Sequence, residues 1–293
     1  MSRNVTAGLD GSPESLAAAE WAAGEAQLRE VPLRLVHSEE SPPAAAVRLA
    51  APQERRRWAD TMLIDTAGHL QRTHPGLTIT TRRLPGRPAE DLPAAAGDAD
   101  MLVLGSRGLS GLMGFLVGSA GMHTIAATEQ PVVLVRAPKE PGEEPVSVPP
   151  GVFREVVVGV DIHQSCDEVL AFAFDEAERR GCALRAVYAW ILAPVLSYDP
   201  LLDPGVQLEV GRGIERTLGD MLAPWRGRHP GVKVVETALI GAPAQQLLHF
   251  AADADLVVVG RLIRTALMGA HIGPVAHAVI HHCAAPVAVV AHN

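Results

Sequence analysis

The stretch from Gly105 to Ser119, GSRGLSGLMGFLVGS, spaces its glycines in a way that could bind an anion. Gly108 follows Gly105 by three residues, and Gly118 comes after nine further residues. Glycine lets main-chain N–H groups approach a ligand without a Cβ in the way. If Ser119 caps a helix, the free amides and dipole at that helix start favour a phosphate.

Asp10 stands in GLDGSPES, directly after an apolar segment, and could complement such a phosphate site. A carboxylate there can accept hydrogen bonds from the hydroxyls or exocyclic amine of a nucleoside. The same residues would also form a turn and a helix N-cap without any ligand. The glycine-rich stretch elsewhere in the chain favours the nucleoside interpretation, and both remain open.

The sequence lacks the residues that several other kinds of site require. The two lysines, Lys139 and Lys233, lie outside any glycine-rich loop, so the P-loop pattern is absent. The sequence Gly105-Ser106-Arg107-Gly108 is one residue too short for the nucleophile elbow of a serine hydrolase. A net charge of −8 without a basic block argues against nucleic acid as a partner.

Histidines near the C-terminal end of the sequence form the one candidate metal cluster. His277 and His281 stand at i and i+4, followed by His282 and Cys283, a spacing that could hold zinc. No fourth partner appears at a recognisable spacing, and we expect no metal there.

Length and composition predict a cytoplasmic protein with a sizeable core. The chain has 293 residues, of which 48% are hydrophobic, and no apolar run approaches a membrane span or a signal peptide. The three cysteines, an odd number without a C-x-x-C pair, are expected to be buried thiols: Cys166, Cys182 and Cys283.

The chain contains two copies of one sequence pattern. VTAGLDGSPES from Val5 matches VVVGVDIHQSC from Val156, and GDADMLVLG matches ADADLVVVG further along. HPG, GRPAEDL and QPVVLVR recur in the same order as HPG, GAPAQQL and APVAVVA. Such self-similarity indicates a tandem repeat of domains. A proline- and glutamate-rich linker separates the copies, so we predict domains at 1–137 and 153–293 joined by 138–152.

Within each copy, short aliphatic runs alternate with helical segments. In the first copy we expect strands near 4–9, 32–37, 77–83, 101–105 and 131–136. Helices are expected near 13–29, 52–73, 88–97 and 118–129. Strands buried on both faces and separated by helices predict an α/β fold with an open, doubly wound, five-stranded parallel sheet. Such sheets bind ligands beyond the carboxyl ends of their strands.

On these motifs the sequence resembles the universal stress protein family, in its tandem-domain form. The resemblance rests on G-x2-G-x9-G-[ST], GLDGSPES, GRPAEDL, GDADMLVLGSRG and QPVVLVR. It implies Rossmann-like domains of the adenine nucleotide alpha hydrolase type, ATP binding with Mg²⁺ or Mn²⁺, and a role in stress regulation. It also implies pairing of the two last strands, which would make an intrachain pseudo-dimer, and further dimerisation between chains.

The resemblance assigns roles only to positions that match its motif. Asp10 would lie against the adenosine, and Ser38 would offer backbone groups to the adenine. The phosphates would be surrounded by Gly105, Arg107, Gly108, Gly118, Ser119 and Ala120.

The second copy keeps only part of this pattern. Asp161, Gly260 and Gly273 repeat the outer positions, but Pro274 replaces Ser119 and Ile263 replaces Gly108. Proline is tolerated in the first turn of a helix, yet it removes an N–H that a phosphate would use. We therefore predict weak or no ATP binding in this half.

Three function classes remain open at this point. The favoured one is a nucleotide-binding regulatory protein. The others are a slow ATPase, for which the sequence offers no obvious general base, and a scaffold that needs no ligand.

Overall fold

The computed structural model describes residues 4–39, 52–108, 115–116, 118–137, 153–191, 204–263 and 272–293. The chain divides into two compact units, Met1–Ser147 and Val148–Asn293. The expected linker 138–152 lies outside the described residues, so the domain boundary itself stays a prediction. Each unit is described by itself below.

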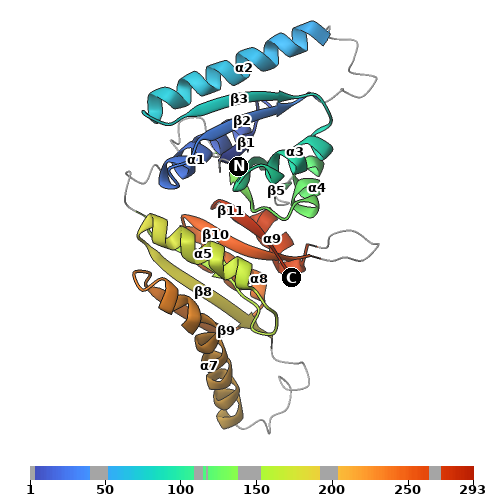
Figure 1. The fold of residues 1–293 in the computed structure, drawn as a ribbon. Helices are drawn as coiled ribbons and strands as arrows, with labels where there is room; N and C mark the ends of the chain where they lie inside the picture. Colours follow the sequence, from blue (N-terminus) through green and yellow to red (C-terminus); the bar gives the residue numbers. More distant parts are fainter. Residues whose placement is uncertain are drawn as a thin grey trace. The chain divides into compact units, whose positions relative to one another are not determined.

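Five parallel strands form the sheet of the first unit (Figure 1). The strands are β1 (Val5–Gly8), β2 (Leu33–Ser38), β3 (Ile79–Leu84), β4 (Met101–Gly108) and β6 (Val132–Arg136), in the order β3-β2-β1-β4-β6. Val5 of β1 lies opposite Leu33 on one side and Met101 on the other. The chain winds outward in both directions from β1 and β4, which makes their carboxyl ends the switch point of the sheet.

Helices pack on this sheet in two groups. The helices are α1 (Pro13–Leu28), α2 (Pro52–Thr73), α3 (Pro88–Gly97) and α4 (Ser119–Ala127). α1 contacts α2, and α3 contacts α4. Three of these helices have proline in the first turn, where its missing N–H costs no hydrogen bond. α1 buries its alanines against β1, β4 and β6, which lets helix and sheet approach closely.

The second unit repeats this architecture. Its strands are β7 (Glu155–Gly159), β8 (Ala183–Trp190), β9 (Val234–Ile240), β10 (Leu256–Leu262) and β11 (Val287–His292), in the order β9-β8-β7-β10-β11. All the neighbouring strands are parallel. Its helices are α5 (Asp167–Arg180), α7 (Pro204–Arg228), α8 (Pro243–Phe250), the short 3-10 helix η1 (Ala251–Asp253) and α9 (Pro274–His282).

The predicted fold class is confirmed, with two differences in the first unit. The strand expected to end at Gly105 continues to Gly108. The backbone of Arg107 and Gly108 then pairs with an additional antiparallel strand, β5 (Phe115–Leu116). Gly108, which we expected in a loop, is thus part of an extended strand. Local composition predicts a turn here, whereas backbone pairing with β5 and with the end of β6 keeps the chain extended.

Candidate functional site

Asp10 lies at the carboxyl edge of the first sheet, two residues beyond β1, and is exposed. Its Oδ1 accepts a hydrogen bond from the backbone N–H of Ser12 at 2.9 Å, and the Ser12 hydroxyl donates to the same oxygen. Ser12 in turn caps α1, because its Oγ accepts from the N–H of Ser15. The carboxylate is therefore oriented by the turn and cap that the sequence also predicted, and it stays accessible at the switch point.

Ser38 ends β2 and is buried. Its hydroxyl lies 2.7 Å from Oδ2 of Asp91 and 3.1 Å from the carbonyl oxygen of Gly86. Asp91 also accepts from the N–H of Gly86 at 2.9 Å, so these groups join β2 to the start of α3. The Ser38 side chain is occupied within the protein, and the expected contact of its backbone with adenine stays a prediction.

Gly105 is required by the packing of the fold. A Cβ at this position would lie 2.5 Å from the backbone carbon of Glu14 and 2.6 Å from the N of Ser15, both in α1. The sequence interpretation placed Gly105 beside phosphate, whereas this contact alone explains why glycine stands here. Arg107 and Gly108 continue the same strand, and their side-chain surroundings lie outside what the structure describes.

Gly118 has no such packing role. No heavy atom of the described residues lies within 4 Å of a Cβ built on it, and its φ of −57° suits any residue. It is the N-cap of α4 and supplies no side-chain cap. Ser119 is the first helical residue, so its expected role as the cap was wrong. Ser119 and Ala120 belong to the first turn of α4, so that no carbonyl group within the helix accepts a hydrogen bond from their N–H groups.

Aromatic residues lie beside Asp10, which the sequence interpretation missed. A Cβ on Gly11 would lie 2.8 Å from the indole of Trp58 in α2, and Gly11 has a φ of +79° that favours glycine. The rings of Trp58 and His37 meet edge to face at 5.6 Å. Trp58 remains 51% exposed. Only the tertiary fold brings it to the carboxyl edge of the sheet.

The second unit has a pocket of about 620 Å³ at the carboxyl ends of β7, β8 and β10. All three residues predicted for the second site line it: Asp161, Gly260 and Gly273. Asp161 repeats the geometry of Asp10, because its Oδ1 accepts from the N–H of His163 at 3.0 Å. A Cβ on Gly260 would lie 2.8 Å from the ring of His292.

The walls of this pocket are aromatic and apolar. Tyr188 and Trp190 of β8 stack at 6.0 Å with 18° between their planes. Burial, followed by the charge of Asp161, raises the pKa of the Tyr188 hydroxyl. No lysine or arginine occurs among the described residues that line the pocket. The described lining therefore offers a stacked aromatic pair, one carboxylate and the polar side chains of His163, Gln164 and His292, without a lysine or an arginine.

The starts of α4 and α9 share a backbone conformation and differ in hydrogen-bond donors. Gly273 has φ and ψ of −60° and 157°, close to −57° and 156° at Gly118. Pro274 follows Gly273 where Ser119 follows Gly118, so α9 lacks the first N–H that α4 offers. The two turns therefore have the same backbone shape, but the turn before α9 has one hydrogen-bond donor fewer for an anion.

The predicted histidine cluster on α9 is partly assembled. The rings of His277 and His281 lie 4.3 Å apart. Burial, and then the neighbouring His281 and His282, lower the pKa of His277. In the part of the chain that the structure describes, no third ligand atom joins this pair. The three cysteines are buried, as predicted, and burial raises the pKa of Cys166 and Cys182 to about 11.

The chain is thus an α/β protein of two repeated, doubly wound domains, each with an acidic residue and a glycine-led helix start at its switch point. A model of the universal stress protein family matches residues 1–136 and 153–291. The chain belongs to the universal stress protein family.

Related proteins match almost the whole chain. Universal stress protein Rv2005c of Mycobacterium tuberculosis is 32% identical over 292 residues, covering 97% of this chain and 96% of the relative. Universal stress protein Rv2623 of the same organism is 29% identical over 297 residues, covering 98% and 96%. A solved universal stress protein from Archaeoglobus fulgidus covers 100% of both chains with a TM-score of 0.70 at 18% identity. The tandem arrangement is therefore shared with proteins of similar length.

No described helix has the length and apolar character needed to cross a membrane.

Proposed function

We propose that this protein is an ATP-binding regulator of a stress response and that its first unit holds the nucleotide. The observation that carries the proposal is the start of α4. Gly118 is exposed and its backbone angles suit any residue, so neither its conformation nor packing against the described residues accounts for a glycine there. A Cβ-free position before unpaired amides suits a phosphate group. The choice of ATP follows the family resemblance.

The remaining site residues fit this proposal in defined roles. The exposed, oriented carboxylate of Asp10 would accept from the adenosine. Trp58 and His37 would contribute aromatic surface beside it. Mg²⁺ or Mn²⁺ would be held mainly by phosphate oxygens and water. Under this proposal, ATP occupancy changes the conformation or the partners of the protein, and hydrolysis is not required.

A thermal-shift experiment tests the assignment to the first unit. ATP should raise the melting temperature of the full chain, because a ligand that binds only the folded state stabilises it by about 2.7 kcal/mol at 100 times Kd. Gly118→Val should abolish this gain, since the added methyl groups point into the open space that the phosphates would fill. Gly273→Val should leave the gain nearly unchanged.

The two variants are matched controls for each other, because the backbone angles agree and a Cβ on either glycine would meet no heavy atom of the described residues within 4 Å. Without ATP, both should melt close to the wild type. Equal losses of the ATP effect in the two variants, or no ATP effect in the wild type, would refute the proposal.

The pocket of the second unit favours a second candidate function, the binding of an uncharged planar molecule. Its volume of about 620 Å³ is typical of small-molecule sites. The stacked pair Tyr188 and Trp190 suits an aromatic ring, and Asp161 suits a hydrogen-bond donor. A triphosphate would find one N–H fewer at the start of α9, because Pro274 has none.

Tryptophan fluorescence tests this candidate. Adenosine should change the emission of the full chain in a way that disappears in Trp190→Phe and weakens in Gly273→Val. ATP at the same concentration should produce no signal that depends on Trp190. A signal from ATP equal to that from adenosine would show that this pocket accepts phosphates and would overturn the distinction between the two units.

A further inference from the structure

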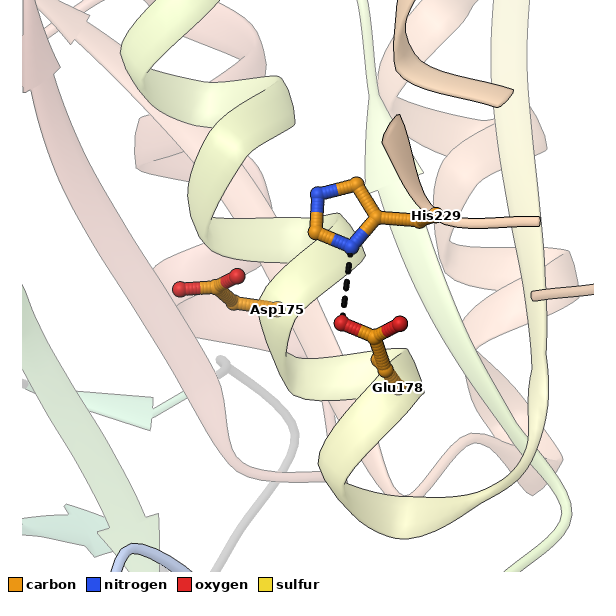
Figure 2. A group of neighbouring side chains, drawn as sticks. All are labelled: Asp175, Glu178 and His229. Atoms are coloured by element: carbon orange, nitrogen blue, oxygen red, sulfur yellow. Dashed lines mark hydrogen bonds and ion pairs between the residues drawn. The ribbon is translucent and has the colours of Figure 1, made fainter. Parts of the chain in front are cut away.

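Three possible metal ligands from α5 and the end of α7 lie together in the second unit, away from the pocket (Figure 2). Asp175 and Glu178 stand at i and i+3 on α5 and therefore share a face of that helix. His229 follows the last residue of α7, and its Nδ1 lies 2.9 Å from Oε2 of Glu178. One nitrogen or oxygen from each residue lies within 4.8 Å of the other two. We propose that Asp175, Glu178 and His229 bind a divalent transition-metal ion.

The imidazole is held in place before any ion binds. The backbone N–H of His229 donates to the carbonyl of Trp225 at 2.9 Å, which continues the last turn of α7. The His229 ring packs on Phe174 with centroids 5.4 Å apart, and its side chain is only 13% exposed. Both carboxylates are exposed and can rotate toward it. One fixed nitrogen with two adjustable oxygens suits an ion that completes its shell with water.

The first unit provides an internal comparison. His74, the repeat equivalent of His229, has its Nδ1 2.7 Å from Oε1 of Gln27 and its Nε2 2.8 Å from Glu20. Gln27 is the equivalent of Glu178, and Gly24 is the equivalent of Asp175. A neutral amide therefore satisfies the structural role of this histidine at Nδ1. In the second unit the carboxylate of Glu178 stands in place of this amide. A second carboxylate, that of Asp175, lies three residues earlier on the same helix.

This replacement places two carboxylates near the histidine of the second unit. Among the described residues, no lysine or arginine forms an ion pair with Asp175 or Glu178, and Glu178 is paired with His229. Two carboxylates beside one imidazole gain from a divalent cation, which neutralises both. Imidazole nitrogen with carboxylate oxygens and no thiolate is a donor set for Zn²⁺ or Mn²⁺.

Calorimetric titration of the nucleotide-free full chain with Zn²⁺ tests the proposal. The wild type should bind an ion that Asp175→Ala weakens about tenfold or more, a loss typical of damage to a metal site. Asp175→Ala should fold normally, because this side chain is exposed and alanine favours a helix. Glu178→Gln should weaken binding similarly. Glu209→Ala, which removes an exposed carboxylate of α7 outside the cluster, should have no effect.

The histidine pair on α9 is the competing zinc site, and His277→Asn distinguishes the two. Binding that survives Asp175→Ala and disappears in His277→Asn would overturn the proposal, as would no binding in the wild type. The double variant Gly24→Asp with Gln27→Glu recreates the carboxylates beside His74. It should add a second equivalent of Zn²⁺, and Gly24 has room for a side chain. No gain there would show that these carboxylates do not recruit the ion and would also count against the proposal.

Discussion

Gly105 and Gly118 belong to the same sequence motif but have different surroundings in the structure. Gly105 faces the backbone of Glu14 at a distance that excludes a Cβ, whereas Gly118 faces open space. The motif predicted both as ligand contacts, since spacing alone cannot separate a glycine needed for packing from one needed for binding. Only the neighbouring atoms make that distinction, and they come from α1, some 90 residues earlier in the chain.

Gly105→Ala should therefore destabilise the first unit even in the absence of nucleotide. The added methyl group would overlap the backbone of α1, which cannot rotate away as a side chain could. Overpacking of this kind typically costs about 1–3 kcal/mol. Urea unfolding would measure the loss, with Gly118→Ala as the control that should change stability little. An unchanged unfolding midpoint for Gly105→Ala would show that α1 moves away from β4 without cost.

At the scale of elements, the two halves end their first helix with the same hydrogen bonds and different residues. α1 is followed by Glu30 with a φ of +56°, and α5 is followed by Gly181 with a φ of +61°. The N–H of Val31 bonds the carbonyl of Ala26, as that of Cys182 bonds that of Ala177. A left-handed residue after a helix is usually glycine, because a Cβ is strained there.

Glu30→Gly should consequently stabilise the first unit by up to about 1 kcal/mol, since it relieves that strain at some cost in chain entropy. Gly181→Glu should destabilise the second unit by a similar amount. Denaturant midpoints of the two variants would check both signs. A loss of stability in Glu30→Gly would mean that interactions of the glutamate side chain stabilise the fold by more than the left-handed backbone of this residue destabilises it.

Most elements of the fold could be predicted because their patterns are local. The buried aliphatic strands, the proline at helix starts and the cap at Ser12 all lie in contiguous sequence. The place of Trp58 could not be predicted, since it depends on a contact between segments far apart in the chain. The extension of β4 to Gly108 and its pairing with β5 were missed because the glycine-rich composition here indicates a loop. The role of Ser119 was missed by one residue, a normal uncertainty for a helix boundary.

At the scale of the whole molecule, the repeat explains how one fold would serve the two kinds of site that we propose. Both sheets have the same strand order, and both place an exposed aspartate beyond their first strand. Both units keep the residues that the fold requires, whereas only the first unit has an N–H group at the first position of the last helix, because Pro274 replaces Ser119 in the second. The pairing of the two units, the linker at 138–152 and any dimer between chains stay predictions of the family resemblance.

The metal-ligand cluster shows what the repeat could have revealed from sequence. Aligning the copies places Glu178 against Gln27 and Asp175 against Gly24, a gain of two acidic residues in one helix. The sequence shows these two substitutions, but it does not show that the two carboxylates lie beside His229. The approach of His229 to α5 depends on how α7 packs, and 51 residues separate the histidine from its glutamate partner.

The stacked pair Tyr188 and Trp190 has a consequence for experiments on this protein. Coupled aromatic transitions give a near-ultraviolet circular dichroism signal only when the two rings are held in fixed orientation, and both rings belong to β8. Tryptophan emission mixes both halves, because Trp21 and Trp58 lie in the first unit and Trp190 and Trp225 in the second. The circular dichroism signal of the stacked pair is specific to the second unit. Stopped-flow circular dichroism, compared with Trp190→Phe, can therefore determine when this half acquires its tertiary structure.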